Sequence, residues 1–360
     1  MVPANEDSDM TTSAPPVRDV TPAHYFDPAP LEAWLRREVE NFGDAMVVQQ
    51  FQGGASNPTF LLTTQTADGP RLYVLRKKPP GVLLASAHQV DREYKVMKAL
   101  DGLVPVPKMR ALCMDEAVIG TAFYVMDYLE GRIFRDATLP GMTPAERTAI
   151  YDDLNATLAK LHKVDFVAAG LGDFGRAGGY FERQVSRWTK QYRGAESEPI
   201  PEMEALIAQL PGRIPKEDPV SIAHGDYRLE NVMFHPTEPK LIAVLDWELS
   251  TIGNPLADIA YNAFLWRSHS PSWGTLQGVD FAASGIPTEA DYVAAWCKRM
   301  GRGPIEDWPF YMAFSIFRLA SISQGVYRRI LAGNAASDRP AENGTPHLAR
   351  QALEILEGRD

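Results

Sequence analysis

Three polar residues stand around two short apolar runs in the segment IAHGDYRLENVMFHPTEPKLIAVLDWELS, residues 222–250. Asp226 lies in a polar loop, Asn231 begins the run NVMFH, and Asp246 follows the run LIAVL. Runs of this length are typical of buried strands, and the PTEP between them is typical of a turn. A hairpin folded about the middle of that turn predicts that Asn231 and Asp246 lie side by side at its open end.

The residue types at these positions suit phosphoryl transfer. Asn231 and Asp246 offer a carboxamide oxygen and a carboxylate, which are ligands for a hard cation such as Mg²⁺. Asp226, five residues before Asn231, is expected to reach the same cavity without binding the metal, where a carboxylate accepts or orients the proton of a hydroxyl. Each residue alone is explained as the polar end of a surface hairpin, but the three in this order favour a catalytic site.

The same segment resembles a known family. Asp226 and Asn231 have the spacing of the kinase catalytic loop, in which an Asp precedes a metal-binding Asn by five positions. HGDYRLENVMF and VLDWE resemble the HGDxxxxN and DxE signatures of the aminoglycoside phosphotransferase and choline-kinase-like family. RKKPPGVLLASAHQVDREYKVMKAL and LDWELSTIGNPLADIAY are similar, more narrowly, to the kinase-like domains fused to, or encoded beside, acyl-CoA dehydrogenases.

The elements that must position these residues fall into two parts. Three β-rich segments separated by the turn signals Gly-Gly and Asp-Gly predict an antiparallel meander, at 46–52, 58–66 and 71–77. A helix and two further strands follow, and beyond Gly131 the apolar spacing is mainly helical, at 143–165, 178–210, 254–268, 288–300 and 306–332. With the resemblance, this predicts an α+β, bilobal, protein-kinase-like fold with a small antiparallel-sheet N-lobe and a larger helical C-lobe.

The predicted organisation of the 360 residues has three parts. Residues 1–22, rich in Pro, Ser, Thr and Asp, are expected to be a disordered leader. Residues 23–130 form a nucleotide-binding lobe, and residues 131–360 form a helical lobe with the catalytic loop and the acceptor site. An amphipathic helix at 30–42 packs either on the first lobe or on a second subunit, so that a homodimer stays open.

Composition excludes several classes of protein. The net charge of −10 argues against a nucleic-acid partner and against a polybasic membrane surface. The apolar runs are too short for a transmembrane helix. Cys113 and Cys297 form no Cys/His cluster, which argues against structural zinc, and two free thiols favour a cytoplasmic location.

The resemblance implies a site for ATP, or GTP, in the first lobe. A kinase needs a cation on the phosphates and a carboxylate that holds this cation. Arg76 stands where relatives carry the Lys or Arg of the third strand, and Glu93 is its expected partner. Lys77 is the alternative to Arg76, although strand alternation turns it to the other face.

Two further segments are candidates for nucleotide contacts. GGASNPTF, which includes Ser56 and Asn57, offers backbone N–H groups to phosphates, although it lacks both the GxGxxG and the Walker A pattern. The backbone of Asp127, Tyr128 and Leu129 is expected to bind the adenine as a hinge.

Several residues near this segment are predicted to support it or to bind the substrate. His224 is expected to brace the loop and Asp258 to tie it to the next helix, while Glu248 either reaches the metal through water or caps the following loop. Arg318, a charge inside an apolar helix, needs a carboxylate of the protein or an anionic substrate as its partner. Arg228 is a further candidate for contact with the substrate.

The predicted function is an Mg-ATP-dependent O-phosphotransferase that acts on the hydroxyl of a small molecule. The resemblance to dehydrogenase-associated kinases implies a hydroxyacyl-CoA or a hydroxy acid as acceptor. An aminoglycoside-type antibiotic phosphotransferase is an alternative, but residues 262–332 hold five acids against seven bases, which does not favour a polycation. A catalytically silent kinase-like module is another alternative. A protein kinase is disfavoured, because the HRD, DFG and APE motifs are missing.

Overall fold

The computed structural model describes residues 11–12, 16–52, 57–79, 89–269, 274–332 and 343–359. The chain forms two compact units, each built from several segments. Unit 1 comprises Met1–Met142, Val167–Phe174 and Arg228–Ser250, and unit 2 comprises Thr143–Phe166, Gly175–Tyr227 and Thr251–Asp360. The catalytic segment identified in the sequence is therefore divided, because Asp226 lies in unit 2 whereas Asn231 and Asp246 lie in unit 1.

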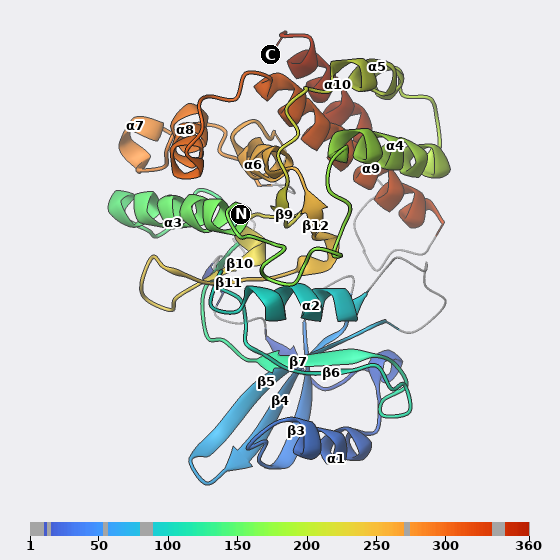
Figure 1. Ribbon diagram of the computed structural model, residues 1–360, viewed down its shortest axis with the longest axis vertical. Helices are drawn as coiled ribbons and strands as arrows, with labels where there is room; N and C mark the ends of the chain where they lie inside the picture. Colours follow the sequence, from blue (N-terminus) through green and yellow to red (C-terminus); the bar gives the residue numbers. More distant parts are fainter. Residues whose placement is uncertain are drawn as a thin grey trace, which may run out of the picture. The chain divides into compact units, whose positions relative to one another are not determined.

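Unit 1 contains a six-stranded antiparallel sheet with the strand order β2-β3-β4-β5-β7-β6 (Figure 1). Its strands are β2 (Val17–Arg18), β3 (Asp44–Phe51), β4 (Thr59–Thr66), β5 (Gly69–Lys77), β6 (Met109–Cys113) and β7 (Phe123–Asp127). The meander predicted from the sequence is β3-β4-β5, and the prediction is confirmed. Two short strands, β1 (Thr11–Thr12) and β8 (Ile133–Phe134), pair outside this sheet.

Two helices pack against this sheet. Helix α1 (Pro28–Glu38) buries Leu31 and Leu35 in a core with sheet residues such as Phe123. Of the two partners that the sequence left open, the structure shows this helix packed on its own lobe. Helix α2 (Val90–Leu100) contacts β6 and β7, and its Glu93 accepts a hydrogen bond from Tyr124. Because neighbouring residues of a strand face opposite sides, α1 and α2 cover opposite faces of the sheet.

The N-terminal part of unit 1 differs from the prediction in two respects. Asp27 caps α1 through the Ala29 N–H, and the helix ends at Glu38, four residues before the predicted end. The chain then turns. Asn41 has a φ of 54°, a left-handed conformation that does not occur inside a right-handed helix. The leader predicted at 1–22 is also too long, because Val17–Arg18 pair with β3 as an edge strand.

The predicted hairpin forms in unit 1 from β10 (Val232–Phe234) and β11 (Leu241–Val244). Its register differs by one residue from the prediction: the Leu245 N–H donates to the Asn231 carbonyl over 2.8 Å, so that Asn231 lies opposite Leu245 and not opposite Asp246. The pairing register of the two strands shifts between Met233 and Phe234. The length of the turn in the sequence does not predict such a shift.

Unit 2 is mainly helical and also contains one pair of antiparallel strands (Figure 1). Its helices are α3 (Pro144–His162), α4 (Tyr180–Ala195), α5 (Pro201–Gln209), α6 (Pro255–Ala263), α7 (Phe281–Ser284), α8 (Glu289–Met300), α9 (Trp308–Leu331) and α10 (Thr345–Leu356), and its strands are β9 (Ser221–Ala223) and β12 (Thr251–Gly253). Helix α9 is largely buried and packs against α4, α6 and α10.

Most of the helices predicted for unit 2 are confirmed, with two corrections. The helical pattern at 178–210 forms two helices, α4 and α5, because Pro199 and Pro201 interrupt the helical backbone. Helix α10 had no counterpart in the prediction.

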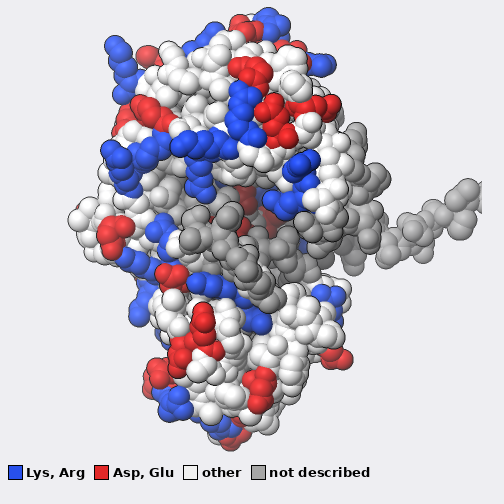
Figure 2. All heavy atoms as spheres, turned by 90° about the vertical axis from the view of Figure 1, so that its right-hand side faces the viewer, with Lys and Arg blue, Asp and Glu red and all other residues white. Residues whose placement is uncertain are grey.

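Among the described residues, no helix combines the length and the apolar character that crossing a membrane requires. Figure 2 shows Lys and Arg interspersed with Asp and Glu over the face drawn.

A tight approach at Gly131 generates a prediction about unit 1. A Cβ at this position would lie 2.5 Å from the Phe234 carbonyl and would also strike the side chain of Met233. We expect Gly131→Ala to lower the free energy of unfolding by about 1–3 kcal/mol, because the β10 backbone must move. Urea unfolding tests this. The control is Gly172→Ala in the same unit, where a Cβ meets open space; equal stability of the two variants would contradict the prediction.

Candidate active site

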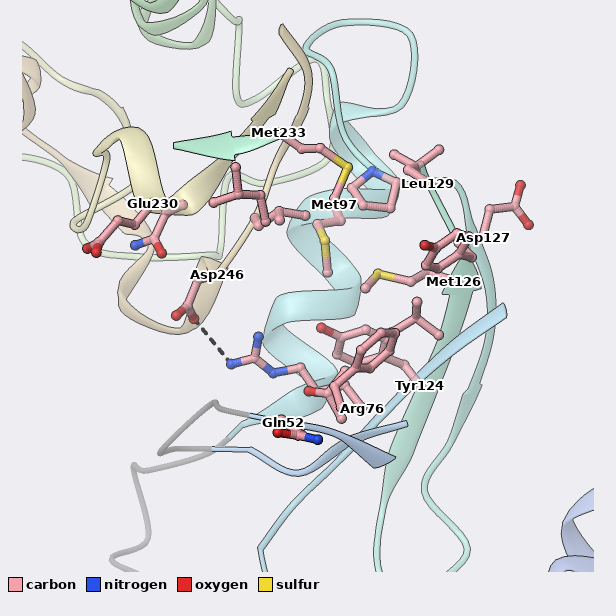
Figure 3. Close-up of a pocket in the computed structure, with 18 of the residues that line it drawn as sticks. Gln52, Arg76, Met97, Tyr124, Met126, Asp127, Leu129, Glu230, Met233 and Asp246 are labelled. Carbon is pink, nitrogen blue, oxygen red and sulfur yellow. Dashed lines mark hydrogen bonds and ion pairs between the residues drawn. The ribbon is translucent and has the colours of Figure 1, made fainter. Parts of the chain in front are cut away.

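A cavity of about 400 Å³ lies within unit 1. Its walls come from β3, β4, β5, β7, α2 and the hairpin, and much of its lining is apolar, with Val74, Met97, Met126, Leu129 and Met233 (Figure 3). Arg76, Asn231 and Asp246 line the same cavity. A cavity with an apolar wall and a charged end can take a ligand that has a flat ring at one end and anionic groups at the other.

The predicted hinge residues form the edge of this cavity. The Asp127 carboxylate binds Arg110 through two hydrogen bonds of 2.6 and 2.7 Å and points away from the cavity (Figure 3). The Tyr128 N–H donates to the Leu72 carbonyl over 3.3 Å. In contrast, the Leu129 N–H has no hydrogen-bond partner within the described part of the chain. Of the three hinge residues, Leu129 is therefore the one with a backbone donor to offer to a ring.

Arg76 lies at the charged end of the cavity and contacts three carboxylates of unit 1. Its Nη2 is 3.2 Å from Asp246 Oδ1, its Nε is 3.3 Å from Glu93 Oε2, and its Nη2 is 3.7 Å from Glu248 Oε2. Only 14% of the Arg76 side chain is exposed. The guanidinium is thus held in one place by these ion pairs, and its Nη2 donates a hydrogen bond to Asp246 Oδ1.

The choice between Arg76 and Lys77 follows from strand alternation. Lys77 is buried on the other face of β5, where its Nζ lies 5.1 Å from the centre of the Phe26 ring and 5.7 Å from that of Phe60. Burial lowers the pKa of the Lys77 ammonium. Arg76 therefore faces the cavity and Lys77 does not.

Glu93 is the buried anchor of this network. Its side chain is 1% exposed and accepts hydrogen bonds from Asn57 Nδ2 at 2.9 Å and from the Tyr124 hydroxyl at 3.0 Å. Burial raises the pKa of the Glu93 carboxyl to about 7, against the opposing effect of Arg76. Burial also lowers the pKa of Arg76, but Tyr124 and the three carboxylates outweigh this effect, so that the guanidinium stays charged.

Asn231 and Asp246 fit a magnesium ion by the chemistry of their donors. Both offer oxygen atoms to the cavity, and both sit at the ends of short strands that fix their backbone. Asp246 has φ 61° and ψ 66°, a left-handed conformation that turns the chain directly after β11. Its carboxylate already balances the charge of Arg76 (Figure 3), which indicates a position suited to a cation.

The other predicted residues of unit 1 have the following places. Ser56 lies outside the described residues. Asn57 is buried and its side chain holds Glu93, so that its predicted contact with phosphate stays a prediction. Arg228 forms an ion pair with Glu230, another residue of the cavity wall.

The predicted catalytic loop around Asp226 is held within unit 2. The Asp258 carboxylate accepts hydrogen bonds from the His224 N–H at 2.6 Å and from the Gly225 N–H at 2.9 Å, so that this residue ties the loop to α6 as expected. Burial of Asp258 raises its pKa, but His162, His224 and the Gly225 N–H outweigh burial and lower it. His224 in turn accepts from the Asp226 N–H through Nδ1 at 3.2 Å, which braces the loop.

Sequence reasoning missed two residues beside this loop. The Tyr261 hydroxyl donates a hydrogen bond to Asp226 Oδ1, and the rings of Tyr261 and Trp188 lie 5.2 and 5.4 Å from the Arg318 guanidinium. Arg318 is 6% exposed and donates to the Gly225 carbonyl. The signal in the sequence is the spacing of Asp258 and Tyr261, which places both on one face of a helix.

Comparison with known proteins gives this geometry its context. The Phosphotransferase enzyme family matches residues 47–308 of the chain. Acyl-CoA dehydrogenase family member 11 of Homo sapiens is 46% identical over 329 residues, which is 89% of this chain and 41% of that protein. The chain thus spans less than half the length of this relative.

Solved structures agree with the sequence comparison. A structure from Ralstonia eutropha, provisionally assigned as an aminoglycoside phosphotransferase, is 48% identical with a TM-score of 0.85 and covers 93% of this chain and 99% of its own. Choline kinase of Cryptosporidium parvum shares the fold at 14% identity, with a TM-score of 0.60 and coverage of 92% and 95%.

The antiparallel sheet, its cavity and the helical unit therefore define a kinase-like fold of the α+β class, as the sequence predicted. Within that class, the chain belongs to the phosphotransferase enzyme family.

The buried carboxyl of Glu93 generates a prediction about pH. Its folded-state pKa of about 7 lies above the usual value for Glu in an unfolded chain, so folding takes up a proton between these two values. The stability that this proton supplies is fully present below the unfolded pKa and is lost as the pH rises through about 7. Between about pH 4 and 8, we expect the free energy of unfolding of wild type to fall by on the order of 3 kcal/mol relative to that of Glu93→Gln.

Urea unfolding across this pH range measures the difference. Glu238→Gln, in the exposed turn of the hairpin, is the matched control and should keep the pH dependence of wild type. Parallel pH profiles of wild type and Glu93→Gln would contradict the prediction.

Proposed function

We propose that this chain is an Mg-ATP-dependent O-phosphotransferase that acts on the hydroxyl of a small molecule. The observation that carries the proposal is the network of Arg76, Glu93 and Asp246 at one end of an apolar cavity in unit 1. A phosphotransferase must neutralise phosphate charge and hold the phosphates in place, and a fixed guanidinium beside a metal-binding carboxylate supplies both.

On the nucleotide side, each part of the cavity has a role. The apolar wall receives the base, and the Leu129 N–H supplies a backbone donor at its edge. Arg76 binds the phosphates with its planar guanidinium, and Glu93 keeps it extended towards them. ATP is the proposed nucleotide, with GTP as the alternative.

Asn231 and Asp246 are the residues that would hold the magnesium ion. When bound, the ion neutralises the charge that develops on the phosphates. Asp246 would then hold the ion in place of the Arg76 guanidinium, whose Nη2 would be available to the phosphates.

On the acceptor side, Asp226 orients the attacking hydroxyl and accepts its proton. No covalent intermediate is required, because positioning and charge stabilisation carry phosphoryl transfer. The bond from the hydroxyl oxygen to the γ-phosphorus forms as the bond to the β-γ bridging oxygen breaks, and ADP leaves.

The proposed acceptor is a hydroxyacyl-CoA or a hydroxy acid. The similarity to part of an acyl-CoA dehydrogenase family member supports this class, since a kinase joined to such an enzyme acts on related acyl compounds. Arg318, a buried cation beside the catalytic loop, is compatible with an anionic acceptor.

Cys113 and Cys297 are both free and buried, which supports the further proposal of a reducing, cytoplasmic location.

The metal ligands generate one prediction. Asp246→Asn removes an anionic oxygen donor, so we expect Mg-ATP binding to weaken by about tenfold or more while binding of metal-free ATP changes little. Fluorescence titration with and without Mg²⁺ measures both affinities. Asp68→Asn, in the exposed turn between β4 and β5, serves as the control. An unchanged response to Mg²⁺ in Asp246→Asn would remove this residue from the proposed metal site.

The catalytic carboxylate generates another prediction. ³¹P NMR follows loss of the γ-phosphate from Mg-ATP in separate pools of hydroxyacyl-CoAs, hydroxy acids, sugars, choline-type amines and aminoglycosides. We expect a phosphorylated product from the acyl-CoA or hydroxy-acid pool. Asp226→Asn should lower the rate by about 100-fold or more with ATP affinity retained.

The control for this assay is Asp307→Asn, an exposed carboxylate of unit 2, which should keep the wild-type rate. Product from the aminoglycoside pool alone would replace the proposed acceptor by an antibiotic. Nucleotide binding without product in any pool would favour a silent binding module. Near-wild-type turnover of Asp226→Asn would refute the role of this residue.

A further inference from the structure

Two residues of α6 form hydrogen bonds with three consecutive residues of the loop 224–226 in unit 2. Asp258 accepts from the His224 and Gly225 N–H groups, and Tyr261, one helical turn later, donates to Asp226 Oδ1. Helix α6 is a rigid support, because all nine of its residues are buried and the Asn254 side chain caps its first turn. The first contact fixes the backbone of the loop, and the second fixes a side-chain oxygen.

Arg318 adds a third point of attachment from α9. Its guanidinium donates to the Gly225 carbonyl and packs near the rings of both Trp188 and Tyr261. Gly225 is therefore held at its N–H by Asp258 and at its carbonyl by Arg318. The same guanidinium packs on the ring whose hydroxyl contacts Asp226, so that loop and ring are fixed together.

This arrangement has a chemical consequence for Asp226. A carboxylate turns readily about its Cβ–Cγ bond, and only some orientations direct an oxygen lone pair at an incoming hydroxyl. A hydroxyl donor held at Oδ1 restricts that rotation. A tyrosine ring without the hydroxyl would fill the same space but would not restrict the rotation.

We propose that Tyr261, supported by Arg318, is a positioning residue that holds the Asp226 carboxylate in the orientation that accepts the proton of the acceptor hydroxyl, an inference that rests on the proposed function. Tyr261 acts through Asp226 and makes no contribution to nucleotide binding. Its loss therefore lowers the rate of transfer and leaves the affinity for ATP as it is.

The test uses the full-length chain, Mg-ATP and the pools of hydroxyacyl-CoAs and hydroxy acids, and compares Tyr261→Phe with wild type. We expect the maximal rate of transfer to fall by about 10- to 100-fold, with the dissociation constant for ATP within about twofold of wild type. The matched control is Tyr192→Phe, which removes another fully buried tyrosine hydroxyl of unit 2, one that makes no contact with the loop. It should transfer at the wild-type rate.

A double variant separates a positioning role from a general structural one. If Tyr261 acts through Asp226, the variant Tyr261→Phe/Asp226→Asn is no slower than Asp226→Asn alone. A loss in the double variant that equals the product of the two single losses would overturn the inference. Arg318→Lys keeps the charge but loses the planar fork, and should lower the rate by about 3- to 10-fold with ATP affinity unchanged.

The outcomes also separate this inference from the proposed function. A wild-type chain that transfers phosphate, with Tyr261→Phe equally active, overturns the role of Tyr261 and leaves the kinase proposal intact. A wild-type chain that binds ATP but transfers to no pool overturns the proposed function and this inference with it.

Discussion

The buried ion network of Arg76 is the interaction on which the site in unit 1 depends. A guanidinium that is largely removed from water is tolerated only when acceptor oxygens surround it. Here α2 brings the Glu93 carboxylate, and the segment after β11 brings those of Asp246 and Glu248. The network therefore joins sheet, helix and hairpin. Glu93 is held by Asn57 and Tyr124, so these two hydrogen bonds help to set the position of the cation.

The site in unit 2 follows a different principle, in which hydrogen bonds to a loop replace ion pairs. The segment 224–226 forms only part of a short connection after β9, and its shape comes from neighbours on α6 and α9. Asp258 is buried and yet charged, because two N–H groups and a histidine satisfy its oxygens. The conformation of this loop is therefore fixed by residues that lie far from it in the sequence.

The chain is similar to only part of a longer protein. The chain contains the elements of a phosphotransferase, whereas the human relative that it resembles is more than twice as long as the matching part. The network around Arg76 lies in unit 1, whereas the loop that carries Asp226 is held by helices of unit 2.

The sequence by itself determined the antiparallel meander, most helices, and the choice of Arg76 over Lys77, because these follow from local periodicity and strand alternation. Tertiary structure decided the hairpin register and the contacts of Tyr261 and Arg318 with the loop. Arg76 and Asp246 are 170 positions apart, and Arg318 and Gly225 are 93 apart. Contacts at such separations leave no periodic trace in the chain, since only packing of the folded units brings these residues together.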